Sequence, residues 1–471
     1  MSPSRSWPAA LSLLIASSCS DPDGGGRLPD ASIEPGADAA TDAAPADAAP
    51  LDASPDARPD AGGDAGPDMA AAFAAIDGMA VLEVGRAGEY QSFELAYVQP
   101  VDHGAPEGPS FEQHMTLLHR SSEAPMVLVA TGYDNYLGGR LEDITYRLSA
   151  NQVVIEKRYH GESRPAEVDW TTLTQEQIAN DAHRLTEALE SIYSGAWIGT
   201  GRSMGGADSV YHRRFFPDDV AGTVAYASAF LLGYPDTRFA GFFDEAVDAD
   251  CEAALEAVQV EILGARRPAM LELAAKGNAY AYERSGGMEP ALETSVLSLP
   301  WVFWQYRGID SCPMVPDAGT AGDEDLFAFH QTVTGAWTAS DEWWSYFEAY
   351  YYQIQAELGA PVIPADHLEG LVDPDVVDIE EGLIPVDADP PVFDAAFVPE
   401  SLAWLEEEGH DIVFIYGELD PWTASRPDVA GVAEVWSFTA PAENHGVEIG
   451  DLDPEDAAVV EGLLEAWGGG E

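Results

Sequence analysis

Apolar and polar positions divide the chain into segments with two different patterns. Between residues 71 and 232, short apolar segments of β-strand character alternate with helical stretches such as residues 174–192. The early segments alternate apolar with polar residues, as half-exposed antiparallel strands do, whereas residues 125–130 form the continuous apolar run of a buried parallel strand. Strands that alternate with helices predict an α/β fold with a mostly parallel, doubly wound sheet. The segments predicted as strands are 92–98, 111–119, 125–130, 153–158, 196–200 and 220–226.

A different pattern covers residues 233–400, which are rich in helix-forming and aromatic residues. Two aromatic clusters, at residues 301–306 and 343–352, predict helices whose rings mostly pack against one another. We therefore expect a helical cap inserted between residues 71–232 and 401–471, which form the two parts of the sheet domain. The strands predicted in the second part are 411–417 and 433–438.

The first residues have the pattern of an export signal. Arg5 precedes a short apolar run, residues 9–16, that is too short to span a membrane. The small residues before Cys19 resemble a bacterial lipobox, although Ala16 stands where leucine is usual. Residues 1–19 are thus predicted to be a signal segment with Cys19 as a lipidated first residue, or an ordinary signal peptide.

Residues 20–70 are a tract of Asp, Ala, Pro and Gly with almost no large apolar side chains, which predicts an extended, disordered linker. The expected location is therefore outside the cytoplasm. The protein would be a lipoprotein anchored to a membrane at the cell surface or in the periplasm, or it would be secreted.

Charge excludes some classes of partner. The chain has 83 acidic and 21 basic residues, a net charge of −62, which argues against nucleic-acid binding and against adhesion to anionic lipid. A cationic substrate, such as a peptide with a free amino terminus, would be attracted, although a solvated acidic surface also accounts for the charge. The sequence holds no zinc-type ligand spacing, and we expect no metal and no cofactor. Cys251 and Cys312 are predicted to form a disulfide, with two free buried thiols as the alternative.

The strongest candidate for chemistry is the sequence Gly-Arg-Ser-Met-Gly at residues 201–205. It lies between the predicted strand 196–200 and a predicted helix, 206–214, which is the setting of a nucleophile elbow in an α/β-hydrolase. Small residues on both sides of the serine suit a strained, crowded turn. The helix amino terminus behind it favours developing negative charge. Ser203 is therefore the predicted nucleophile.

Two further candidates follow the last two predicted strands. Asp420 follows the first of them and His445 the second, so the chain order is Ser, Asp, His. His445 is predicted to be the base that takes the serine proton, and Asp420 to orient its imidazole, with Glu418 as the second choice for that acid. The oxyanion is expected to bind the N–H of Met204 and that of Gly132 or Tyr133, in the loop after the third predicted strand.

With these residues the chain resembles the secreted prolyl tri/tetrapeptidyl aminopeptidases of bacteria. The resemblance implies an α/β-hydrolase fold and a serine peptidase that removes peptides of two to four residues, with proline nearby, from free amino termini. Arg202 stands where that family usually has glycine and Met204 where it often has lysine, so both are expected to alter the rim of the cleft. The blocks that carry the resemblance are 99–103, 111–113, 131–133, 197–206, 211–217, 416–417 with 420–422, and 444–446.

Another block, residues 156–163, is similar to one in the lysosomal prolyl carboxypeptidase and dipeptidyl peptidase group, and we expect it to form a structural ion-pair turn. Two other functions stay open: an esterase or lipase on the same scaffold, and an inactive surface-tethered binding protein. A cap carboxylate aimed at Ser203 would favour the peptidase by binding the substrate ammonium. The cap offers many candidates, which include Asp341, Glu342 and Glu348 in the predicted aromatic helix.

Overall fold

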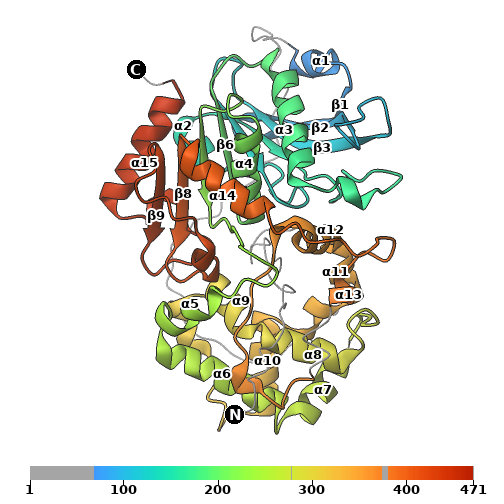
Figure 1. Cartoon of the computed structure of the whole chain (residues 1–471), viewed down its shortest axis with the longest axis vertical. Helices are drawn as coiled ribbons and strands as arrows, with labels where there is room; N and C mark the ends of the chain where they lie inside the picture. The colour runs from blue at the N-terminus through green and yellow to red at the C-terminus, as the bar shows by residue number, and fades with distance from the viewer. Residues whose placement is uncertain (1–67, 277, 374–379, 470–471) are drawn as a thin grey trace, which may run out of the picture.

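The computed structural model describes residues 68–276, 278–373 and 380–469, which form a sheet domain and a helical lobe (Figure 1). The predicted signal segment, Cys19 and nearly all of the predicted linker lie outside the described residues. Regular structure begins with helix α1 (Met69–Ala74), which Asp68 caps by accepting the Ala71 N–H. The helix therefore includes residues 69 and 70, which the sequence placed at the end of the linker.

One nine-stranded sheet organises the upper part of the molecule, in the order β1-β2-β3-β5-β4-β6-β7-β8-β9. The β1–β2, β2–β3 and β3–β5 pairs are antiparallel, and every later pair is parallel. This confirms the predicted mostly parallel sheet with antiparallel strands at its start. The strands are β1 (Met79–Ala87), β2 (Tyr90–Pro100), β3 (Ser110–His119), β4 (Met126–Ala130), β5 (Asn151–Ile155), β6 (Trp197–Arg202), β7 (Gly222–Tyr226), β8 (Ile412–Gly417) and β9 (Val435–Ala440).

Helices cover both faces of the sheet, which completes the α/β-hydrolase architecture. Met126 and Leu128 of β4 pack in the cluster that holds side chains of α1 and α3, while Val127 and Val129 pack in the cluster of α2 and α15. Because successive strand residues point to opposite faces, a strand buried on both sides has the continuous apolar run noted above. The helices of this domain are α1, α2 (Asp143–Leu148), η2 (Trp170–Thr172), α3 (Gln175–Glu190), α4 (Met204–Phe215), α14 (Phe397–Glu407), η8 (Pro421–Ser425), η9 (Ile449–Asp451) and α15 (Pro454–Trp467).

Between β7 and β8 the chain leaves the sheet and forms the helical lobe in the lower half of Figure 1. Trp301, Trp304, Trp344 and Tyr351 are almost completely buried, so these aromatic rings fill the interior of the lobe. The domain boundaries at residues 232 and 400 stay predictions. The helices of the lobe are α5 (Phe239–Glu245), α6 (Ala249–Leu263), α7 (Arg267–Ala275), α8 (Met288–Leu297), α9 (Leu299–Tyr306), η3 (Ile309–Met314), α10 (Asp323–Val333), η4 (Ala336–Ala339), α11 (Asp341–Tyr346), α12 (Glu348–Gln353), η5 (Ile354–Leu358), η6 (Asp366–Leu368) and α13 (Glu380–Leu383).

Two cap features bear on the predictions. Cys251 of α6 and Cys312 of η3 form a disulfide with Cα atoms 5.6 Å apart, so the predicted pairing is confirmed.

The prediction of a single aromatic helix is wrong, because the segment forms two short helices, α11 and α12, that meet at Phe347. The Phe347 ring packs edge-on against Tyr133 of the sheet domain, so tertiary packing decides where the helix breaks.

Candidate active site

Ser203 occupies a sharp turn between β6 and α4. Its backbone has φ +57° and ψ −124°, a conformation that residues with a side chain rarely adopt. The Ser203 N–H donates to the Tyr226 carbonyl of the neighbouring strand at 2.8 Å. A Cβ atom at Gly205 would lie 2.0 Å from the carbonyl oxygen of Ala130, so only glycine fits there. The structure therefore has the strand, turn and helix that the motif predicted, with α4 beginning at Met204.

The residues predicted as acid and base are in contact. Asp420 follows β8, His445 follows β9, and Asp420 Oδ2 lies 2.7 Å from His445 Nδ1 with both side chains buried. An ionised carboxylate only accepts hydrogen bonds, so this pair assigns the proton to Nδ1 and leaves Nε2 able to act as a base. Glu418, the second choice for the acid, instead accepts the Ala442 N–H at 2.9 Å.

Arg202 holds the main chain of the histidine loop. One guanidinium nitrogen, Nη1, donates to the carbonyl oxygens of His445 and Val447 at 2.7 and 2.8 Å. Since Arg202 directly precedes Ser203, these bonds bring the nucleophile strand and the His445 loop together. An effect of Arg202 on the rim of the cleft stays a prediction.

The predicted oxyanion loop lies against the nucleophile turn. It follows β4, the fourth strand rather than the third, because β1 precedes the strands that the sequence indicated. Gly132 has φ +79°, and a Cβ atom there would lie 2.5 Å from the Gly205 nitrogen. The Tyr133 N–H points to Thr131 Oγ1 at 3.4 Å. The loop thus sits close to the α4 amino terminus, and the choice of Gly132 or Tyr133 as donor stays a prediction.

A pocket of about 390 Å³, counting its opening to solvent, lies beside Ser203. Its walls come from the sheet domain and the cap and are mainly apolar and aromatic. Among the described residues that line it, none carries a carboxylate. The lining residues are Tyr133, Ser203, Met204, Ala207, Ala229, Leu231, Tyr350, Ile354, Leu358, Gly359 and Trp422.

The three cap carboxylates proposed from the sequence lie elsewhere. Asp341 accepts the backbone N–H groups of Glu283 and Arg284 at 3.0 and 2.8 Å. Glu348 pairs with Arg164 of the sheet domain at 2.6 Å. Glu342 is exposed and is not among the residues that line the pocket. None of the three lines the pocket, and a cap carboxylate that points at Ser203 from two or three residue lengths away stays a prediction.

A buried polar chain links the nucleophile helix to the cap. Asp208 of α4 pairs with Lys157 at 3.1 Å and accepts from the Gln175 side chain at 2.8 Å. Glu357 of the π-helix η5 accepts the Gln175 N–H at 2.6 Å and so caps the first turn of α3. Burial raises the pKa of Glu357 to about 7, against the smaller opposing effects of hydrogen bonds from Gln353 and Gln175 and of the Lys157 charge. Asp208, unexpected beside the nucleophile, is thus a partner in an ion pair.

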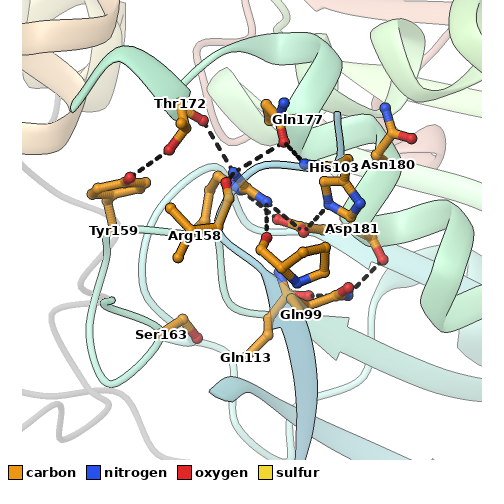
Figure 2. Close-up of polar contacts among 12 residues, drawn as sticks. Gln99, His103, Gln113, Arg158, Tyr159, Ser163, Thr172, Gln177, Asn180 and Asp181 are labelled. Atoms are coloured by element: carbon orange, nitrogen blue, oxygen red, sulfur yellow. Dashed lines mark hydrogen bonds and ion pairs between the residues drawn. The ribbon is translucent and has the colours of Figure 1, made fainter. Parts of the chain in front are cut away.

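Residues 156–163 form the predicted ion-pair turn, and Figure 2 shows its centre. Arg158 and Asp181 are completely buried and form two hydrogen bonds, of 2.6 and 2.7 Å, between guanidinium and carboxylate. His103 Nε2 adds a third contact to Asp181 at 2.7 Å, and Arg158 Nη1 donates to the Thr172 carbonyl oxygen at 3.0 Å (Figure 2). This network fixes the turn that carries Lys157.

In the part of the chain that the structure describes, no three His, Cys, Asp or Glu side chains are grouped to hold a metal ion. Over the same residues, no helix has the length and apolar character that crossing a membrane requires.

Comparison with known families decides the class of the protein. The model of the PS-10 peptidase S37 family matches residues 64–470. The chain belongs to the S37 peptidase family. This S37 peptidase is 34% identical over 400 residues to the prolyl tri/tetrapeptidyl aminopeptidase of Streptomyces mobaraensis, an alignment that covers 84% of this chain and 83% of that one. The family and this relative make the chain a serine peptidase.

Solved structures similar to this S37 peptidase include two hydrolases. The proline iminopeptidase of Mycobacterium smegmatis has a TM-score of 0.41 at 14% identity, covering 79% of this chain and 98% of that chain. An alpha/beta hydrolase of Novosphingobium aromaticivorans has a TM-score of 0.35 at 17% identity, covering 81% of this chain and 99% of that chain.

Proposed function

We propose that this protein is an exported serine exopeptidase that releases proline-containing peptides of two to four residues from free amino termini. The observation that carries the proposal is the 34% identity, over 84% of the chain, to a prolyl tri/tetrapeptidyl aminopeptidase. The contact between Asp420 and His445, on loops at the same sheet edge as Ser203, supports the chemistry.

The proposed reaction proceeds through an acyl-enzyme. Ser203 Oγ attacks the scissile carbonyl carbon while His445 Nε2 takes the hydroxyl proton, and Asp420 stabilises the resulting imidazolium through Nδ1. The tetrahedral intermediate collapses, the C–N bond breaks, and His445 returns the proton to the leaving amine. Water, activated by the same histidine, then cleaves the Ser203 ester and releases the amino-terminal peptide.

Two backbone donors are proposed to stabilise the oxyanion. The Met204 N–H lies at the amino terminus of α4, and the second donor is Gly132 or Tyr133 in the loop pressed against that turn. Each donor of this kind contributes about 10²–10³-fold to turnover. The apolar pocket beside Ser203 has walls suited to a proline ring, because the Tyr133, Tyr350 and Trp422 side chains can cover it.

The esterase alternative has one observation in its favour. The residues that line the Ser203 pocket are mainly apolar and include no carboxylate, and such a pocket also suits an acyl chain. A screen of the purified protein separates the two functions. It compares a tripeptidyl-prolyl anilide with a free amino terminus, the same compound acetylated, and p-nitrophenyl butyrate. The peptidase proposal predicts turnover of the free peptide and almost none of the acetylated one. Equal rates on both peptides, with faster ester cleavage, would assign an esterase.

Export is the second part of the proposal, and it rests on the sequence of residues 1–70. We infer a lipid anchor on Cys19 followed by a flexible linker, with secretion of an unlipidated form as the alternative. Metabolic labelling with a palmitate analogue should mark the wild-type protein in the membrane fraction and leave Cys19→Ser unlabelled. Equal labelling of both proteins would remove the anchor from Cys19.

A further inference from the structure

Arg202 makes a set of contacts that the reaction described above does not use. Its Nη1 donates to two carbonyl oxygens of the histidine loop, those of His445 and Val447. Its guanidinium carbon lies 5.1 Å from the centre of the Tyr226 ring. Arg202 and Tyr226 are paired residues of the parallel strands β6 and β7. The guanidinium is thus held between a strand of the sheet and the loop that carries the predicted base.

These contacts are strong and directional for physical reasons. A charged donor such as a guanidinium gives hydrogen bonds about twice as strong as neutral ones. Stacking on Tyr226 restricts the plane of the group, so its N–H vectors have fixed directions. The Tyr226 ring is buried, and the backbone carbonyl of the same residue accepts the Ser203 N–H at 2.8 Å. Arg202 therefore contacts both the histidine loop and Tyr226, the residue that holds the backbone of Ser203.

Other contacts of His445 constrain different degrees of freedom. Asp420 fixes the tilt of the imidazole through Nδ1, and the His445 N–H donates to the Gln305 carbonyl of the cap at 3.1 Å. Val447 and Ile449 are completely buried and anchor the loop on the sheet domain. Apolar burial keeps the loop docked, but it is non-directional and permits sliding. The Arg202 hydrogen bonds differ from these contacts, because they join the main chain of the loop to the strand that leads into the nucleophile.

We propose that Arg202 is a positioning residue that sets the distance from His445 Nε2 to Ser203 Oγ by holding the main chain of the histidine loop. The proposal rests on the roles given to Ser203 and His445 under the proposed function. The hydrogen bonds of Arg202 run to the loop, so it acts through the main chain of His445.

The test compares three variants of the full-length protein. Arg202→Met keeps the length of the side chain and removes every donor, and Arg202→Lys keeps the charge without the planar fork. Arg184→Met is the matched control, because Arg184 also donates to a backbone carbonyl, that of Val98 at 3.2 Å, and also stacks on a tyrosine, Tyr97 at 5.3 Å. The measurements are the rate of fluorophosphonate labelling at Ser203, and kcat and KM on the peptide anilide.

Arg202→Met should label about 10²-fold more slowly than the wild type and lose kcat by a similar factor, because a displacement of about 1 Å has that effect on a positioned reaction. Its KM should change by less than about twofold, because the pocket is intact. Arg202→Lys should recover part of the loss, since its ammonium keeps N–H donors and charge but lacks the planar group that stacks on Tyr226. Arg184→Met should label at the wild-type rate.

Labelling of Arg202→Met at the wild-type rate overturns the proposal, as does a loss confined to KM. Near-ultraviolet circular dichroism shows whether Arg202→Met folds. If it does not fold, Arg202→Lys takes its place in the test. A wild-type labelling rate in Arg202→Lys then overturns the proposal. Failure of the peptidase function is a separate result: the wild type then labels but leaves peptides intact, and the labelling rates still test Arg202. A wild type that does not label overturns both proposals.

Discussion

The backbone of the nucleophile turn has an unfavourable conformation that neighbouring residues stabilise. Positive φ at a residue with a side chain costs about 1–3 kcal/mol, and Ser203 adopts it at +57°. The hydrogen bond from its N–H to Tyr226 and the close fit of Gly205 under Ala130 hold that conformation. The hydroxyl is thereby held at the carboxyl end of β6, where the loops of Asp420 and His445 also lie.

Asp420 is expected to be essential for turnover. Asp420→Asn should lower kcat by about 10⁴-fold with the fold intact, because an amide no longer fixes the histidine tautomer. Turnover of the peptide anilide measures the loss. Glu418→Gln is the matched control and should retain activity, since Glu418 bonds to the Ala442 N–H rather than to His445. A mild loss in Asp420→Asn with a severe one in Glu418→Gln would exchange the two roles.

Sequence reasoning found the residues whose chemistry has a characteristic order and spacing. Ser203 and Asp420 follow the buried strands β6 and β8, and His445 follows the half-buried strand β9, so each comes after a strand that the sequence pattern indicated. The role of Arg202 in holding the His445 loop was not visible, because it depends on two carbonyls more than 240 positions away in the chain. The cap carboxylates could not be placed for a similar reason: acidic residues are abundant, and only packing decides which of them face a pocket.

At the scale of elements, the π-helix η5 joins the pocket to the core of the sheet domain. Ile354 and Leu358 line the Ser203 pocket, while Glu357 caps α3. Strand β1 and the division of the aromatic segment into α11 and α12 were both missed. Strand β1 is mostly exposed and so has no clear apolar alternation, and the break at Phe347 follows from packing against Tyr133. A sequence pattern reveals elements that bury one face in the core. It does not reveal an exposed strand such as β1 or a helix break such as the one at Phe347.

The buried carboxyl of Glu357 predicts a pH-dependent stability. Burial raises its pKa in the folded chain from 4.5 to about 7, so the folded state holds the proton more tightly than the unfolded state does. Its contribution to stability is fully present below pH 4.5 and is lost as the pH rises through about 7. The loss amounts to about 3 kcal/mol at 1.36 kcal/mol per pKa unit. Lys157 and Asp208 are the charged groups that act on it from the sheet domain.

Glu357→Gln removes this titration. As the pH rises from 5 to 8, the wild type should lose free energy of unfolding and the variant should not. The difference between the two should therefore grow in favour of the variant, as measured by urea denaturation at each pH. Glu406→Gln, at an exposed position of α14, is the control and should follow the wild-type curve. Parallel curves for Glu357→Gln and the wild type would show that Glu357 does not titrate in this range.

At the scale of the whole molecule, the cap is tied together by one covalent link and packs on the sheet domain. The disulfide joins Cys251 to Cys312, 61 residues apart, and so holds α6 against η3. In the chain-entropy account, a closed loop of that length stabilises the fold by about 4 kcal/mol. The Cys251→Ser/Cys312→Ser double variant should therefore unfold at lower denaturant concentration, and the wild type should match it once reduced. An unchanged midpoint after reduction would mean that the disulfide contributes nothing to stability.

The proposed activity itself depends on both domains, because the pocket beside Ser203 has walls from the sheet and from the cap. The most direct measurement is the mass of the covalent intermediate. The protein is mixed with a free-amino peptide anilide, quenched in acid within milliseconds, digested and analysed by mass spectrometry. The account predicts a mass increase equal to the amino-terminal acyl group on the fragment that contains Ser203, absent in Ser203→Ala and absent with the acetylated substrate. An adduct on another residue, or equal adducts from free and acetylated peptides, would contradict it.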